Sequence, residues 1–472
     1  MKRATLIAVF GLLVASPTAV AAPPWSVSQN VSSTGFGIWG QPHVGVDADG
    51  RALATWVAVT NPVSDVKSGY SLRPRLAFRD PGAAEFRPEQ DSPSFDGAPI
   101  LYGSGRVLGL SLLDDPYSSE PARLDAISGT PPGGFSAKAI HTFTSEPMSD
   151  PALALHRNAV AAWAEETGYS YPAPAAVRAS IRRPGRDFGR SRKLSRAGWV
   201  GGVVAGAGPG VVFVAWERND RVEARVKPRG RPWGPVQRLG SATRDSITFA
   251  VAFSGRRAYL AWLDQDVLGE PADANPSIVR TAILPGGRTR FRVPRTVDRI
   301  SRRVPREPGR IALAALRGHG ALVAWTDWDG RSFRARAAVT GRRARFGRPI
   351  SVSPPGEPAV LADVESIPAG RPNAGTVLAV WSSLDATGMF GERVRAAVRG
   401  ATGRFRAGED VSDVARAPQP DLPFFERLVP DLAFDRVSRR WIVVWAQPVS
   451  ERAPPPFDGA PTTVLRSATR PG

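Results

Sequence analysis

The chain has 472 residues, with 62 Lys and Arg against 43 Asp and Glu, and its formal net charge is +19. It contains no Cys, which excludes disulfide frameworks, thiolate metal sites and cysteine nucleophiles. The hydrophobic fraction of 42% is that of an ordinary globular protein, so the composition excludes a chain that is disordered throughout. The basic balance favours acidic partners.

Residues 1–21 have the organisation of a secretory signal peptide. Lys2 and Arg3 precede an apolar run and a small-residue cleavage site before Ala22. The apolar run is too short to span a bilayer. We therefore expect a secreted, extracellular protein whose mature part, residues 22–472, forms one domain.

A run rich in Ala and Val that ends in Trp recurs along the chain, as in ALATW, AYLAW and ALVAW. An eighth, degenerate copy reads VLGLSL and puts Leu112 in the Trp place. Successive positions lie 46 to 64 residues apart, a period that is typical of repeat architectures. The seven tryptophans are Trp56, Trp163, Trp216, Trp262, Trp325, Trp381 and Trp445.

A second signature follows each run: a strand-like segment, a turn with Gly or Pro, and an aromatic residue. The last unit lacks this aromatic, but WSVSQNVS, which begins at Trp25, matches the missing piece. An N-terminal strand that completes the last unit closes a circular array and removes its exposed sheet edges. The sequence therefore predicts an all-β fold, a single β-propeller of eight four-stranded blades, with seven blades as the alternative because unit two is weak.

The third unit shows the expected strands, which cover residues 152–155, 159–164, 176–181 and 188–194. Its second strand is apolar on both faces, as a strand between neighbouring blades requires. We expect the repeated Trp to fill the space between blades, because a residue present in nearly every unit serves what every unit needs.

The Ala-x-x-Ala-Trp strand, the following Val-Arg-Ala-Ala run and the Gly-Arg-Phe-Gly turn resemble secreted bacterial propeller repeats that are loosely similar to sialidases. The resemblance implies the propeller fold over the mature chain. Sialidases carry repeated Asp-boxes, and the nearest match here is TDWDGRSF, where Trp328 stands in the expected Asp position. No catalytic residue of that family can be placed on this chain.

Carboxylates directly follow the Trp-bearing strands, in what we expect to be the turns between second and third strands. Those turns project from one face of a propeller and are the most variable in length, which suits recognition. The alternatives for these acids are Ca²⁺ ligation, a glycosidase carboxyl pair, or solvated turn residues. The first such pair is Asp114 and Asp115, and the candidate ligand-binding residues are Glu165, Glu166, Glu217, Asp264, Asp266, Asp327, Asp329 and Asp385.

The turns expected on the opposite face are short and basic. Arginines there suit capture of a polyanion through bidentate contacts, and the alternative is again a solvated turn. The candidate polyanion-binding residues are Arg182, Arg183, Arg229, Arg231, Arg288, Arg342 and Arg343.

The four His residues show no paired spacing, so we expect no cofactor and no metal site; Ca²⁺ is an unsupported alternative. We expect the partner to be an extracellular glycan, anionic polymer or protein. Nucleic acid is disfavoured, because the basic turns carry few aromatics and the chain has an export signal. The sequence favours a non-enzymatic binding protein that uses long loops on one face. The alternative is a glycan-active enzyme, a sialidase-like hydrolase or a polysaccharide lyase, that uses loop carboxylates.

Overall fold

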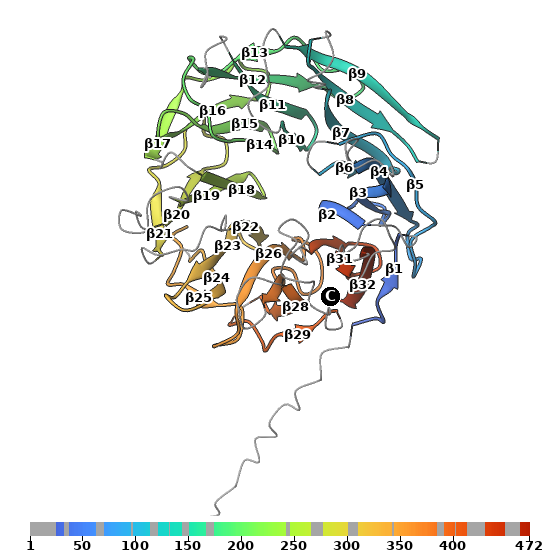
Figure 1. Ribbon diagram of the computed structural model, residues 1–472. Coiled ribbons are helices and arrows are strands. Elements are labelled where there is room, and N and C mark those ends of the chain that lie inside the picture. Colours follow the sequence, from blue (N-terminus) through green and yellow to red (C-terminus); the bar gives the residue numbers. More distant parts are fainter. Residues whose placement is uncertain are drawn as a thin grey trace, which may run out of the picture.

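The computed structural model describes residues 25–32, 37–62, 70–95, 98–113, 121–131, 133–143, 151–166, 174–241, 246–265, 277–300, 310–341, 344–384, 391–401, 403–412, 430–448 and 463–472. These residues form eight four-stranded antiparallel sheets in a ring (Figure 1). No helix occurs among them, hence none that could cross a membrane. The predicted eight-bladed β-propeller is confirmed. The predicted signal peptide lies outside the described residues.

Each blade is a sheet whose strands follow one another in the chain. Blade 1 consists of β2 (Gly37–Val46), β3 (Ala52–Pro62), β4 (Tyr70–Arg79) and β5 (Gln90–Asp91), and blade 2 of β6 (Ile100–Tyr102), β7 (Arg106–Leu113), β8 (Arg123–Gly129) and β9 (Phe135–Thr142). Blade 3 consists of β10 (Ala152–Leu155), β11 (Ala159–Glu166), β12 (Ala175–Arg182) and β13 (Arg192–Lys193), and blade 4 of β14 (Val203–Gly208), β15 (Val211–Glu217), β16 (Arg221–Pro228) and β17 (Gln237–Ser241).

Blades 5 to 8 repeat this order, and the last blade takes its outer strand from the beginning of the chain. Blade 5 consists of β18 (Ser246–Ser254), β19 (Arg257–Gln265), β20 (Ile278–Leu284) and β21 (Arg295–Arg299), and blade 6 of β22 (Ile311–Leu316), β23 (Gly320–Trp328), β24 (Phe333–Val339) and β25 (Ile350–Ser351). Blade 7 consists of β26 (Ala359–Ser366), β27 (Val377–Leu384), β28 (Gly391–Arg399) and β29 (Glu409–Asp410), and blade 8 of β30 (Asp431–Asp435), β31 (Arg440–Pro448), β32 (Thr463–Pro471) and β1 (Gln29–Asn30).

The ring closes where the N-terminal strand joins the last blade, as the sequence predicts. In β1, Gln29 pairs with Ser467 and Asn30 with Arg466 of β32, so both chain ends lie in blade 8. A buried ion pair ties blade 8 to blade 1, with Arg79 Nη2 donating to Asp435 Oδ2 at 2.8 Å. β1 thus pairs with the outer side of β32, which would otherwise be the exposed edge strand of blade 8.

Antiparallel strands fix which turns share a face. The first strand of each blade lies innermost in the ring (Figure 1). The turns between first and second strands and between third and fourth strands therefore lie on one face. The turns between second and third strands, together with the connections between blades, lie on the opposite face.

The repeated tryptophans fill the spaces between blades, which confirms their predicted core role. Six of them are at most 1% exposed and Trp56 is 4% exposed. Each packs against the preceding blade: Trp381, for example, lies among Ala312, Leu322 and Ala335 of blade 6. The repeated run rich in Ala and Val thus supplies small side chains on one blade for the indole of the next.

The assignment of Leu112 to the Trp place is wrong by one residue. In the other blades the Trp pairs across the sheet with a charged residue, as Trp163 does with Arg178. In blade 2 it is Ser111 that pairs with a charged residue, Asp125, whereas Leu112 packs toward blade 3. Successive side chains of a strand point to opposite faces, so a shift of one residue reverses the direction.

The space between blades 1 and 2 is filled differently. Phe95, which follows the outer strand of blade 1, places its ring against Gly109 of β7, so close that a Cβ on Gly109 would lie 2.2 Å from it. The ring also packs edge-on against Phe135 at a centroid distance of 6.1 Å. Among the described residues this is the one blade interface without a repeated Trp.

Candidate functional site

The candidate acids of the second strands lie deeper than the sequence predicts. Glu165, Glu217, Asp264 and Asp327 belong to the ends of β11, β15, β19 and β23 rather than to turns, and they are 3%, 0%, 3% and 8% exposed. Glu166 is half-buried at the end of β11. The strands extend past the Trp because the next residues continue the cross-strand pairing, as Glu165 does with Ala176.

Two of these acids join neighbouring blades. Glu165 pairs with Arg178, which lies opposite Trp163 in the sheet, and its Oε1 lies 3.0 Å from His141 Nε2 of blade 2. A buried carboxylate requires such a partner, since an unpaired charge in the interior is costly.

Asp327 follows the same pattern in blade 6. Its Oδ2 accepts a hydrogen bond of 2.9 Å from Arg336 Nη1, which also reaches Asp298 Oδ2 of blade 5 at 3.2 Å. Burial raises the pKa of the Asp298 carboxyl, while Arg336 opposes that rise. The sequence Trp-x-acid with an Arg across the sheet thus bridges adjacent blades.

Asp329 is the one described candidate acid that lies in a turn. Its Oδ1 accepts hydrogen bonds of 2.8 Å from the backbone N–H groups of Arg331 and Ser332, and it pairs with Arg334. Such bonding is how Asp shapes a turn. The structure does not bring the described candidate acids to one site, and their ligand-binding role stays a prediction. Asp266, Asp385 and the pair Asp114 and Asp115 lie outside the described residues.

The described candidate arginines lie in, or directly before, turns that share one face. We call the turns between first and second strands and between third and fourth strands of blades 3 to 6 the arginine face. Exposed arginines occur in each of these blades, whereas Asp187 is the only described carboxylate in these turns. Its exposed basic members include Arg157, Arg183, Arg186, Arg190, Arg229, Arg231, Arg256, Arg288, Arg290, Arg317 and Arg345. Arg342 and Arg343 fall in the same turn as Arg345 but lie outside the described residues.

Positive charges on the arginine face lie close enough to affect one another. The pKa of Lys227 in blade 4 is lowered by burial and then by Arg183 of blade 3. Asp187 forms a hydrogen bond of 2.5 Å with Lys138 of blade 2, which lowers the pKa of its carboxyl. The only described acid of these turns is therefore already neutralised.

Most candidate arginines there carry an uncompensated charge. Arg182 is held in place, with Nε donating to the Arg186 carbonyl at 2.9 Å. Arg183, Arg229, Arg231 and Arg288 are exposed and have no ion-pair partner among the described residues. An exposed guanidinium can bind a carboxylate, sulfate or phosphate through two parallel hydrogen bonds.

A groove of 790 Å³ runs along the outer side between blades 4 and 5 and reaches this face at Arg290. Its other lining residues include Arg221, Arg238 and Arg292, with Asp220 at the far end. Val293, which is 87% exposed, also lines it. The groove extends the basic surface around the rim of the ring.

The innermost strands of blades 6, 7, 8 and 1 hold a second polar cluster, which the sequence did not indicate. Arg310 lies directly before β22, and its Nη1 donates to Gln41 Oε1 of β2 at 2.8 Å, across the ring from blade 6 to blade 1. Asp431 opens β30 and accepts a 2.7 Å hydrogen bond from the Val44 N–H. His43 Nδ1 lies 3.7 Å from the same carboxylate.

Two further carboxyl groups, Asp363 and Glu365 of β26, complete this cluster. We call it the channel cluster, and its members are Gln41, His43, Arg310, Asp363, Glu365 and Asp431. Burial raises the pKa of Asp363 well above its usual value, and Asp431 and then Glu365 reinforce the rise. Burial also raises the pKa of Glu365, to about 7. Several carboxyls crowded around one arginine cannot all ionise at low cost, so Asp363 keeps its proton at pH values where an ordinary Asp has lost it.

Sequence reasoning missed this cluster because its members come from four inner strands with no shared motif. The one available signal was position: Asp363, Glu365 and Asp431 are acids within short inner strands that are rich in apolar residues. Among the described residues, no group of three or more His, Asp or Glu side chains is arranged to hold a metal ion. The suggestion of Ca²⁺ stays untested.

No protein-family model matches the sequence, and no curated protein matches it significantly. Solved structures resemble its fold. Polysaccharide lyase Uly1 has a TM-score of 0.43 at 9% identity, covering 94% of this chain and 99% of that one. A protein of unknown function from Dyadobacter fermentans has a TM-score of 0.41 at 11% identity, with coverage of 94% and 99%. NanB sialidase from Streptococcus pneumoniae has a TM-score of 0.38 at 9% identity, with coverage of 77% and 68%. These likenesses concern the propeller fold alone.

Proposed function

We propose that this chain is a secreted, non-enzymatic propeller that binds an extracellular anionic polymer through the arginine face. The observation that carries the proposal is the charge of those turns: four successive blades present exposed arginines, and the only described acid among these turns, Asp187, is paired with Lys138. Recognition thus lies on the face opposite the long loops that the sequence favours; those loops lie outside the described residues, and their role stays a prediction.

The chemistry favours a polymer over a small anion. Arg183, Arg229 and Arg288 lie on the turns of three successive blades, so no single small group can contact all of them. A chain with repeated carboxylates or sulfates can bind each arginine in turn and release the counterions held on both partners. Such binding weakens steeply as the salt concentration rises.

The test compares two variants with equal loss of charge. Arg183, Arg229, Arg231 and Arg288 are all changed to Gln in one, and Arg73, Arg196, Arg299 and Arg331, exposed on the opposite face, are changed to Gln in the other. We expect only the first variant to lose most of its affinity for dextran sulfate. The slope of its log affinity against log salt concentration should fall by up to about one for each arginine removed. Neutral dextran should not bind either protein.

Equal losses in the two variants would show that net charge, and not the arginine face, governs binding. Strong binding of single-stranded DNA at physiological salt would contradict the expectation that nucleic acid is not the partner. Retention of a sulfated or carboxylated glycan at that salt would identify the class of polymer.

A second candidate function, action on a glycan, is supported by the channel cluster. Acid-catalysed cleavage of a glycosidic bond needs a carboxyl that keeps its proton, and Asp363, whose pKa is raised by burial and then by the neighbouring Asp431, is such a group. If this reading holds, Asp363→Asn abolishes turnover of acidic polysaccharides, while Asp91→Asn, an exposed control, does not. Absence of turnover by the unchanged protein over a broad panel of glycans would reject it.

A further inference from the structure

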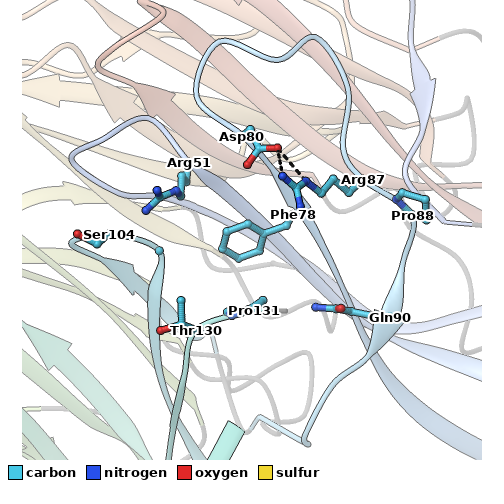
Figure 2. A pocket seen from close by; sticks show the side chains of 10 residues that line it. Arg51, Phe78, Asp80, Arg87, Pro88, Gln90, Ser104, Thr130 and Pro131 are labelled. Carbon is cyan, nitrogen blue, oxygen red and sulfur yellow. Dashed lines mark hydrogen bonds and ion pairs between the residues drawn. The ribbon is translucent and has the colours of Figure 1, made fainter. Parts of the chain in front are cut away.

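A cavity of 390 Å³ opens between blades 1 and 2, on the same side of the ring as the arginine face but away from blades 3 to 6. Its walls come from the turns of both blades, and Figure 2 shows Arg51 and Arg87 on either side of the Phe78 ring. The volume lies at the lower end of the range of small-molecule sites, about 300–1,000 Å³. It suits a ligand of one or two rings.

The wall of the cavity is held in place by a network of acid to backbone hydrogen bonds. Asp47 Oδ1 accepts from the Arg51 N–H at 3.0 Å, and its Oδ2 accepts from Gly105 N–H of blade 2 at 2.9 Å. Asp49 Oδ2 accepts from Ser104 N–H at 3.0 Å. The turns of the two blades are therefore fixed relative to each other before any ligand arrives, which lowers the entropic cost of binding.

Arg51 is the unusual residue of this cavity. Its guanidinium lines the pocket and has no hydrogen-bond or ion-pair partner among the described residues, and its Nη1 is shielded from solvent. Gly105 leaves room for it, since a Cβ there would lie 3.2 Å from Arg51 Nη1. A shielded guanidinium N–H without an acceptor costs free energy, and a bound anion that accepts its hydrogen bond removes that cost.

The other polar and apolar groups define what kind of anion fits. Asp80 is already occupied by Arg87, which donates to its Oδ2 from Nε at 2.8 Å and from Nη2 at 2.5 Å, so the three charged lining residues leave a net positive charge. Phe78 offers an apolar surface, and the Gln90 amide lies across the cavity from Arg51 (Figure 2).

We propose that this cavity binds a single ring that carries a carboxylate, with the carboxylate on Arg51, the ring against Phe78 and a polar substituent at Gln90. Such a ring occurs in an acidic sugar and in an aromatic acid. This site is separate from the polymer-binding face, because its residues lie on blades 1 and 2.

The test is calorimetric titration of the full mature chain with glucuronate and with benzoate, each beside its uncharged counterpart, glucose or benzyl alcohol. We expect one of the two acids to bind and its uncharged counterpart to bind at least tenfold more weakly. Arg51→Gln should weaken binding of the acid at least tenfold, because a charge-assisted pair is lost. Arg106→Gln, an exposed arginine beside the cavity that does not line it, should leave binding unchanged.

The identity of the acid that binds distinguishes a sugar ligand from an aromatic one. Binding of neither acid at tens of millimolar, equal binding of acid and uncharged ring, or equal losses in Arg51→Gln and Arg106→Gln would each overturn the proposal. Thermal unfolding of Arg51→Gln checks that the variant folds, and Phe78→Leu offers a second variant that keeps the charge but removes the aromatic surface. The variant of the arginine face in which Arg183, Arg229, Arg231 and Arg288 are changed to Gln should bind the acid as the unchanged protein does.

Discussion

A large aromatic ring fills the space between blades 6 and 7 and also the space between blades 1 and 2, but the two rings come from different residues. Between blades 6 and 7, the indole of Trp381 is fully buried against the inner strands of blade 6. Between blades 1 and 2, the ring comes from the other side, as Phe95 of blade 1 packs on Gly109 of blade 2. Each blade interface of the described structure therefore contains a large aromatic ring, but either of the two blades can supply it.

The difference also affects the surface. The 1–2 interface carries the cavity at Arg51, while its buried core is limited to Leu53, Leu76, Leu101 and Val107 with partly buried phenylalanines around them. The interface that departs from the repeat also holds a preformed pocket on its turn side, and there we expect a function that the other interfaces do not share.

Loss of a repeated Trp should have the largest effect on stability. We expect Trp325→Ala to lower the free energy of unfolding by about 3–5 kcal/mol, because a fully buried indole leaves a cavity. Phe95→Ala should cost less than half of that, since Phe95 remains partly exposed. Urea unfolding of both variants measures the difference. A fully stable Trp325→Ala protein would contradict the core assignment.

The closing interface offers a second contrast, between a buried and an exposed ion pair. Asp435→Asn leaves Arg79 buried without its counter-charge and should cost about 3–5 kcal/mol. Asp80→Asn removes the partner of Arg87 at the rim and should cost at most about 1 kcal/mol. Because burial lowers the pKa of Arg79 while Asp435 raises it, the double variant Arg79→Met with Asp435→Asn should recover much of the loss. No recovery would mean that the ion pair itself, and not the uncompensated charge, stabilises the closure.

Substitution of Gly109 tests whether the Phe95 ring of blade 1 fills the interface with blade 2. Gly109→Ala places a methyl group against the Phe95 ring and should destabilise the protein by about 1–3 kcal/mol through overpacking. Combined with Phe95→Leu, the same alanine should cost less, and a double-mutant cycle measures this coupling. Additive effects would show that the two residues do not share the interface.

The inner strands give a small effect that depends on pH. The folded pKa of Glu365 is about 7, above its usual 4.5, so its stabilising contribution is complete below pH 4.5 and is lost as the pH rises through 7. The unchanged protein should therefore unfold more easily at pH 8 than at pH 5. Glu365→Gln cannot ionise and should reduce that difference by about 1–2 kcal/mol. Thermal unfolding over this pH range provides the measurement, and an unaltered pH dependence would contradict the assignment.

The fold could be predicted from the sequence because the Trp-bearing strands repeat and Trp25 supplies the missing outer strand. These signals are local, and each blade repeats them. The Leu112 position was wrong because the two-residue period of a strand leaves the direction of each side chain open in a degenerate copy. The pairing of Ser111 with the charged Asp125 identifies Ser111 as the residue in the Trp place.

The candidate site was only partly predictable. The basic turns could be recognised, because Arg183 and Arg229 stand in turns that the repeat itself places on one face. The channel cluster and the Arg51 cavity could not, since Arg310 contacts Gln41 across 269 positions and Arg51 depends on Gly105 of the next blade. Contacts between blades follow from ring geometry, which no local pattern records.

Hydrogen exchange of the mature chain with and without dextran sulfate tests directly whether the polymer binds to the arginine face. We predict slower exchange in the turns that cover residues 183–191, 229–236 and 285–294, on blades 3 to 5, with little change where second strands end. Protection confined to the ends of second strands, or spread evenly over both faces, would contradict binding through the arginine face.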